Sequence, residues 1–190
     1  MADYRKEIRQ YIEMEKQVLD ALPVEDISDV MNVLENARLT GSRIFICGNG
    51  GSASTASHLQ CDFNKGISYD QAVKYDVECL SDNVSMMMSI ANDIGYEDIF
   101  VVPLRNKMKK KDVLIGISGS GNSENVIRAF RYAGEVGAET VAFTGYDGGR
   151  LKKLARHNIH VAVDNMQITE DIHLILNHMM MFILSGMKGC

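Results

Sequence analysis

The sequence predicts a three-layer α/β/α sandwich built on a five-stranded parallel sheet, with additional helices at the N-terminus. Short apolar runs such as 43–47 and 113–117 lack the polar–apolar alternation of half-exposed strands, which is typical of strands buried on both faces. Segments with helical periodicity separate these runs, as connections between parallel strands require. A chain of 190 residues fits one domain of this kind.

Two helices are predicted before the first strand. Residues 4–22 carry apolar side chains at helical spacing, including Ile8, Ile12 and Leu19, and Pro23 ends this helix. Residues 26–39 repeat the pattern. We expect the segment 1–40 to pack on the rest of the domain and at a subunit interface.

The remaining elements alternate along the chain. Strands are expected at residues 43–47, 72–80, 113–117, 140–144 and 159–163. Helices are expected after the glycine-rich turn at 48–52 and at residues 83–91, 96–108, 124–136, 151–155 and 169–187. Pro103 lies in an early turn of its helix or kinks it. No linker or repeat divides the chain, so we expect a single domain over residues 1–190.

The final predicted helix is apolar on nearly every face. A helix of this kind is usually buried all round. Because the domain is small, we expect a second subunit to cover the helix, and therefore a homo-oligomer.

Composition excludes several classes of protein. Apolar residues make up 46% and charged residues 24% of the chain, as in ordinary globular domains. The net charge of -5 gives no basis for non-specific nucleic-acid binding. The charged start MADYRKEIRQ lacks the apolar core of a signal peptide, and the apolar run at 179–184 is well short of the ~20 residues that cross a bilayer. We expect a cytoplasmic protein with no nucleic-acid or membrane partner.

The four cysteines follow no close-spaced pattern, so neither a zinc ribbon nor a disulfide framework is expected. They are Cys47, Cys61, Cys79 and Cys190. Cys47 and Cys79 lie in apolar runs, which favours buried thiols.

Two glycine- and serine-rich loops each connect a predicted strand to a predicted helix, at residues 48–52 and 118–123. Helix N-termini at the carboxyl ends of parallel strands present free N–H groups and a positive dipole end, which suit a phosphate. Glycines such as Gly50, Gly51 and Gly119 leave room for close backbone approach, and serines add donors. Neither loop is a dinucleotide or P-loop motif, so we expect a phosphate monoester site and no nucleotide cofactor.

Four motifs in this order resemble the sugar isomerase (SIS) domain family over essentially the whole chain. They are GNGGSA at 48–53, ANDIGY at 91–96, ISGSGNS at 117–123 and TGYDGG at 144–149. Within the family the chain looks closest to the phosphoheptose isomerases, which interconvert sedoheptulose 7-phosphate and D-glycero-D-manno-heptose 7-phosphate. The resemblance implies a five-stranded, flavodoxin-like sandwich and a homotetramer with sites at subunit interfaces.

The resemblance also implies roles for individual residues. Phosphate-binding serines of the family match Ser52, Ser118, Ser120 and Ser123. Residues that contact or approach the sugar match Asn49 and Asp93. The family's second loop usually has threonine where this chain has Gly119, so one hydroxyl donor is lost and the backbone N–H remains.

Aldose–ketose isomerisation requires a base that removes a proton next to the carbonyl and an acid at the oxygens, with an enediolate between them. His58 and Asp62 are spaced i, i+4 and therefore share one helical face directly after the first loop. Glu170 and His178 lie on the final helix. We expect His178 and Asp62 to be the acid–base pair and Glu170 to contact the substrate.

Some family members bind zinc through residues matching His58, Asp62, Glu170 and His178, and two histidines with two carboxylates form a plausible zinc set. Glu170 and His178 are eight residues apart, or ~12 Å along an α-helix. Both reach one ion only if the helix begins after Glu170 or if two subunits contribute ligands.

The chain departs from the family at the catalytic residues, because Asp62 replaces a glutamate, Glu170 a glutamine, and Gln167 a common aspartate. The shorter carboxylate is withdrawn by ~1.5 Å, and a ~1 Å misplacement costs ~100-fold in rate. Glu170 is expected to compensate by returning a carboxylate to the site. Two alternatives remain: a sugar-phosphate- or partner-protein-binding SIS module without catalysis, and an isomerase of another phosphosugar.

Overall fold

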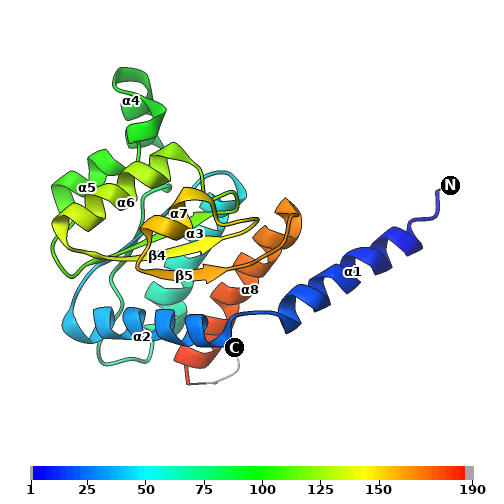
Figure 1. The fold of residues 1–190 in the computed structure, drawn as a ribbon. Helices are drawn as coiled ribbons and strands as arrows, with labels where there is room; N and C mark the ends of the chain where they lie inside the picture. Colours follow the sequence, from blue (N-terminus) through cyan, green and yellow to red (C-terminus); the bar gives the residue numbers. More distant parts are fainter. Residues whose placement is uncertain (1, 187–190) are drawn as a thin grey trace.

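The computed structural model describes residues 2–186 and contains the predicted all-parallel sheet (Figure 1). Its strands are β1 (Ile44–Gly48), β2 (Val77–Cys79), β3 (Val113–Ser118), β4 (Glu139–Thr144) and β5 (His157–His160). They pair in the order β2-β1-β3-β4-β5. The prediction of five parallel strands is confirmed.

Helices cover both faces of the sheet and complete the predicted three layers. The helical elements are α1 (Arg5–Asp20), α2 (Val24–Thr40), α3 (Gly51–Cys61), the π-helix η1 (Asp62–Ile67), α4 (Val84–Asp93), the 3₁₀ turn η2 (Tyr96–Asp98), α5 (Val101–Lys107), α6 (Glu124–Val136), α7 (Gly149–Leu154) and α8 (Met166–Leu184). One apolar cluster joins α2, α3 and α8 to one face, and a second joins α5, α6 and α7 to the other. All residues of β1 and β3 are buried, which explains their continuous apolar character.

The two glycine- and serine-rich loops lie side by side. They follow β1 and β3, which are neighbours in the sheet, while β2 flanks β1 on its other side. The strand order therefore reverses between β1 and β3, and open parallel sheets bind ligands at such a switch point.

Several predicted boundaries were wrong. The strand expected at 72–80 covers only Val77–Cys79, because β1 offers partners only to those three residues. The helix expected at 96–108 is split into η2 and α5, with Pro103 in the first turn of α5, where its missing N–H costs no hydrogen bond. The last strand runs at His157–His160 instead of 159–163.

The final helix begins earlier than predicted, at Met166 instead of residue 169, because the Asn165 side chain accepts a hydrogen bond from the Ile168 N–H and caps the helix. Its described part ends at Leu184, and Met187 lies outside the described residues. No helix within residues 2–186 is long and apolar enough to span a membrane.

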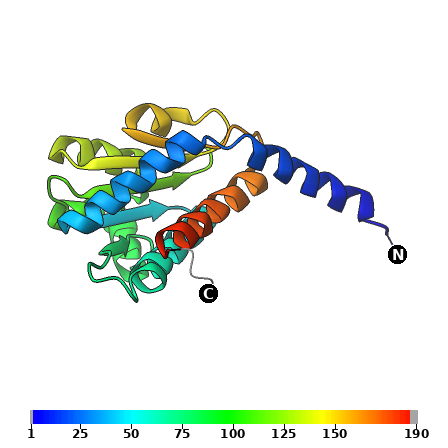
Figure 2. The same cartoon turned by 90° about the horizontal axis from the view of Figure 1, so that it is seen from below.

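The first helix projects away from the rest of the molecule (Figures 1 and 2). None of the described residues of α1 is buried, and Ile8 and Ile12 are 56% and 48% exposed. Tyr11 and Val18 of the same helix pack against the core cluster beside α8, so α1 packs on the domain only in part, and the expectation that all of residues 1–40 pack on it was too broad.

Cys47 and Cys79 are buried as predicted, and Cys61 is exposed. Burial raises the pKa of the Cys79 thiol to about 11 and raises the pKa of Cys47 further, so both thiols stay protonated and unreactive. Cys190 lies outside the described residues.

Candidate functional site

A pocket of about 180 Å³ opens where the two loops meet. It is lined by Asn49, Ser52, Ile117, Ser118, Gly119, Ser120, Ser123, Met166 and Glu170. All four serines that were predicted to bind phosphate therefore reach one pocket.

The second loop presents its hydroxyls at the start of a long helix. Ser123 is the N-cap residue of α6, and its Oγ lies 3.3 Å from the Oγ of Ser118. Gly121 has a φ of +63°, and a Cβ there would lie 2.0 Å from the Gly148 carbonyl oxygen. Only glycine fits this turn, which leaves the free N–H groups of α6 facing the pocket.

A residue larger than Gly119 would contact the side chain of Met166 at the start of α8. A Cβ at this position would lie 2.8 Å from the Sδ of Met166, which also lines the pocket. The side chain of Met166 therefore takes the space that Gly119 leaves open.

Glu170 lies against the first turn of α3. A Cβ on Gly51 would lie 2.3–2.6 Å from the carboxyl atoms of Glu170, so the carboxyl group packs directly on the glycine. A carboxylate at a helix N-terminus is stabilised by the helix dipole. Glu170 thus contributes the one acidic group among the residues that line this pocket.

Asn49 uses its side chain to join the two loops. Its Nδ2 donates to Asn125 Oδ1, and Asn125 Nδ2 donates back to Asn49 Oδ1, both at 2.9 Å. The Tyr96 hydroxyl also donates to Asn49 Oδ1 at 2.9 Å. Both ends of the Asn49 amide are therefore engaged, and one N–H of the amide is left for a ligand.

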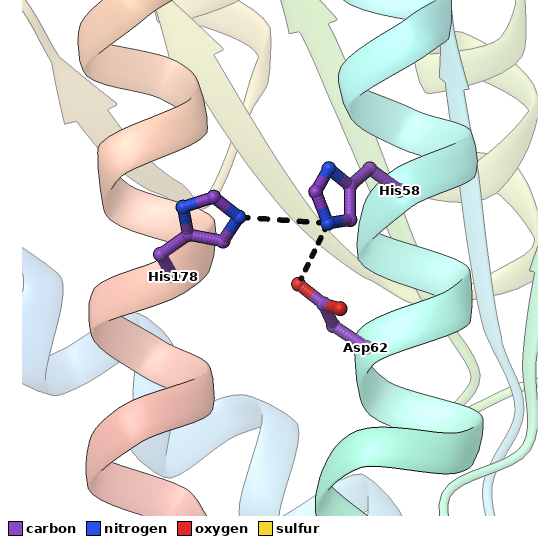
Figure 3. A group of neighbouring side chains, drawn as sticks. All are labelled: His58, Asp62 and His178. Atoms are coloured by element: carbon purple, nitrogen blue, oxygen red, sulfur yellow. Dashed lines mark hydrogen bonds and ion pairs between the residues drawn. The ribbon is translucent and has the colours of Figure 1, made fainter. Parts of the chain in front are cut away.

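Two histidines and a carboxylate meet where α3 packs against α8 (Figure 3). The Nε2 of His58 lies 3.5 Å from the Nε2 of His178 and 3.4 Å from the Oδ2 of Asp62. The predicted i, i+4 pairing of His58 and Asp62 is confirmed, and α8 brings His178 to the same point. Both imidazole rings are exposed, so a ligand can reach them.

The carboxylate of Asp62 is held by a hydrogen bond from the buried side chain of Asn177. The Asp62 side chain is 10% exposed, and Asn177 Nδ2 donates to its Oδ2 at 2.7 Å. Asn177 is fully buried beside His178 on α8. This hydrogen bond fixes the orientation of the carboxylate and leaves its second oxygen free to accept a proton.

The donor set fits a zinc ion. Tetrahedral ligands at the usual zinc bond lengths of ~2.0–2.1 Å lie ~3.3 Å from one another. The two distances from His58 Nε2, 3.5 and 3.4 Å, are close to that separation, and all three donor atoms lie within 4.8 Å of one another. A fourth position facing solvent would suit water or substrate oxygen.

Glu170 does not join this cluster within the described chain. The helix is continuous from Met166 to Leu184, so Glu170 and His178 stay ~12 Å apart along it. The three candidate ligands within residues 2–186 are His58, Asp62 and His178. Glu170 and His178 of one subunit could bind the same ion only if the helix began after Glu170, and it begins at Met166.

Asp93 lies away from both groups. Its carboxylate is exposed at the end of α4 and accepts hydrogen bonds from Ser89 Oγ and Asn92 Nδ2. Seven of the ten predicted substrate residues therefore line one pocket. Of the other three, Gly51 packs against Glu170, Gly50 lines a second pocket that shares Asn49, and Asp93 lines neither.

Sequence reasoning missed Met166, Asn125 and Asn177. Asn125 lies two residues after the second loop, and Asn177 precedes His178 in an apolar helix. A polar residue in so apolar a segment is a signal that it has a specific partner, because a buried unpaired amide is costly.

Comparisons with known proteins agree with this geometry. A model of the SIS domain matches residues 3–145. The phosphoheptose isomerase of Clostridium acetobutylicum is 34% identical over 173 residues, which are 90% of this chain and 88% of that protein. That of Helicobacter pylori strain P12 is 34% identical over 93% of this chain and 91% of its own length.

Solved structures share the whole fold. The phosphoheptose isomerase GmhA from Neisseria gonorrhoeae superposes with a TM-score of 0.89 at 25% identity, covering 97% of this chain and 100% of that one. A phosphoheptose isomerase from Francisella tularensis gives the same TM-score and coverage at 23% identity, which concerns the fold alone.

Proposed function

This chain belongs to the SIS domain family and, within it, to the phosphoheptose isomerases, and from that premise we propose that it interconverts sedoheptulose 7-phosphate and D-glycero-D-manno-heptose 7-phosphate. The observation that carries the proposal is a serine-lined pocket at the N-termini of α3 and α6, combined with a His58–Asp62–His178 cluster where α3 and η1 meet α8.

We assign the phosphate to the serine-lined pocket. The hydroxyls of Ser52, Ser118, Ser120 and Ser123 and the free N–H groups of α3 and α6 offer donors to the phosphate oxygens. Glu170 is expected to accept hydrogen bonds from sugar hydroxyls, because a carboxylate has acceptors only.

The separation of the two groups fits a seven-carbon substrate. Glu170 lines the phosphate pocket and His178 belongs to the cluster, and the helical rise between these two residues of α8 is ~12 Å. An extended chain advances about 1.2 Å per bond, so the eight bonds from C1 to phosphorus in a heptose 7-phosphate span ~10 Å. A hexose 6-phosphate is one carbon shorter and spans ~1.2 Å less.

Asp62 and His178 are the proposed acid–base pair. One of them removes the proton from the carbon next to the carbonyl, and the other exchanges a proton with the substrate oxygens while the enediolate forms and collapses. The hydrogen bond from Asn177 holds the Asp62 carboxylate in one orientation beside His58.

We also propose that His58, Asp62 and His178 hold zinc, which when bound would stabilise the developing negative charge on the substrate oxygens. Glu170 of a second subunit would be the fourth ligand of the set inferred from the sequence. Within one subunit, the geometry of α8 supports only the set of His58, Asp62 and His178.

We further propose a homo-oligomer, with a tetramer as the expected state. The exposed apolar face of α1 and an apolar groove of about 420 Å³ lined by residues of α2 and α8 support this assembly. The unpaired thiols of Cys47, Cys61 and Cys79 support a reducing, cytoplasmic location.

The test is to incubate the pure protein with sedoheptulose 7-phosphate, with and without zinc, and to follow the products by NMR. The proposal predicts the aldose heptose 7-phosphate. Thermal stabilisation by the sugar phosphate without conversion would contradict it and indicate a binding module.

A further inference from the structure

The free side of the edge strand β2 is hydrogen-bonded by a row of side chains. Cys79 N–H donates to Gln60 Oε1, Val77 N–H donates to Asn64 Oδ1 at 3.0 Å, and Tyr75 N–H donates to Ser68 Oγ at 2.9 Å. Asn64 Nδ2 also donates to the Val77 carbonyl at 2.8 Å. Gln60, Asn64 and Ser68, the polar ladder, thus replace the missing neighbour strand of β2.

The spacing of the polar ladder matches the strand. Its residues recur every four positions along α3 and η1, while their backbone partners recur every two positions in the opposite direction. Four helical residues rise ~6 Å and two strand residues ~6.6 Å, so the two rows stay in step.

The π-helical segment keeps the polar ladder on one face. In an α-helix each i+4 residue is rotated by about 40°, so a third member would drift away from the strand. After Asp62 the chain winds more widely, as the 3.2 Å bond from Ser68 N to Phe63 O shows. Each residue then turns by less, and Ser68 still reaches Tyr75.

Asp62 lies at the start of this wider winding, between Gln60 and Asn64, and its side chain extends to the opposite side, toward α8. There it meets Asn177 at 2.7 Å and His58 at 3.4 Å (Figure 3). The polar ladder on one side therefore sets the rotation of the backbone at Asp62, and this rotation determines how close the Asp62 carboxylate comes to His58 on the other side.

We propose that Asn64 is a positioning residue: its two hydrogen bonds to Val77 fix the helical rotation that brings the short carboxylate of Asp62 to His58 and His178. The catalytic part of this proposal rests on the proposed isomerase function. Asn64 itself faces the sheet edge and touches none of the three residues.

The test compares Asn64→Leu, which removes both bonds, with Asn158→Leu. The control substitution removes the 3.1 Å bond that Asn158 Nδ2, on the opposite edge strand β5, donates to the Lys152 carbonyl. Two readouts are used: the NMR resonances of the His58 ring, and kcat and KM for sedoheptulose 7-phosphate. Asn64→Leu is expected to move the His58 resonances toward those of Asp62→Asn and to lower kcat at least ~10-fold with KM within twofold. Asn158→Leu should change neither readout.

A double variant separates positioning from stability. If Asn64 acts through Asp62, Asn64→Leu changes the residual kcat less than twofold in the Asp62→Asn background. Asn64→Asp, which keeps the acceptor for the Val77 N–H, should lose less activity than Asn64→Leu and serves if the latter does not fold. Unchanged His58 resonances in the Asn64 variants, or an equal kcat loss in both backgrounds, overturns the proposal. Absence of turnover in the wild type overturns only the isomerase function, because the His58 resonances still test the positioning.

Discussion

The substitution Asp62→Glu tests whether this site is built around the shorter carboxylate. The extra methylene moves the carboxyl group by ~1.5 Å, one carbon–carbon bond. Asn177 Nδ2 holds the present carboxylate at 2.7 Å, and such bonds tolerate only about 0.5 Å of lengthening. Because Asp62 is 8% exposed, the added group has no solvent to enter.

The expected losses follow from that geometry. Leaving the buried Asn177 amide unpaired costs about 2 kcal/mol, which lowers the Tm by ~4–8 °C in a chain of this size. A carboxylate displaced by ~1 Å or more lowers kcat by ~100-fold. Differential scanning calorimetry and an isomerase assay on sedoheptulose 7-phosphate measure the two effects. Asp164→Glu, which lengthens an exposed carboxylate, is the control and should change neither.

An Asp62→Glu enzyme as active as the wild type would refute this reasoning, because it would show that the site accepts the longer side chain without adjustment. The companion substitution Glu170→Gln tests whether Glu170 compensates for Asp62. Compensation predicts that the double variant differs from the product of the two single effects on kcat, and strictly independent effects would contradict it.

Three further predictions concern the phosphate pocket, the buried histidine and the metal. Gly51→Ala should lower the Tm, because its Cβ would lie 2.3–2.6 Å from the Glu170 carboxyl atoms. In a Glu170→Ala background the same substitution should raise the Tm, because alanine has a better helix propensity than glycine by about 0.5–1 kcal/mol. A lower Tm in both backgrounds would contradict the placement of Glu170. Burial lowers the pKa of His173 from 6.5 to about 4. The neutral ring therefore contributes its full stabilisation above pH 6.5, and about 3 kcal/mol of the free energy of unfolding is lost as pH falls from 6.5 to 4. His173→Leu should reduce this pH dependence, measured by denaturant titration at several pH values, and an unchanged dependence would contradict the prediction. Elemental analysis should find zinc with the wild type and little with His58→Ala or His178→Ala, whereas equal zinc in all three would place the metal elsewhere.

Much of the fold was predictable because it depends on local patterns. Apolar runs predicted β1, β3 and β4 closely, whereas β2 and β5 were predicted with wrong bounds. The two glycine- and serine-rich loops after 43–47 and 113–117 do lie side by side and line one pocket. The i, i+4 spacing of His58 and Asp62 was sufficient to predict their contact.

The errors arise where distant residues decide the local structure. The strand at β2 is shorter than its apolar composition suggests, because pairing with β1 and bonds from Gln60 and Asn64 involve only a few of its residues. The contact between Asn177 and Asp62 joins residues 115 positions apart, and no periodicity encodes it. The π-helical turn after Asp62 likewise depends on the polar ladder, which exists only once the helix lies against the sheet edge.

The comparison of seven- and six-carbon substrates tests the central claim most directly. The measurement is kcat/KM of the wild type for sedoheptulose 7-phosphate and for fructose 6-phosphate under the same conditions. Because Glu170 of the phosphate pocket and His178 of the cluster are separated by a helical rise of ~12 Å, and the shorter sugar spans ~1.2 Å less, the account predicts a preference for the heptose of at least ~10-fold. Equal or faster turnover of fructose 6-phosphate, or turnover of neither sugar, would contradict it.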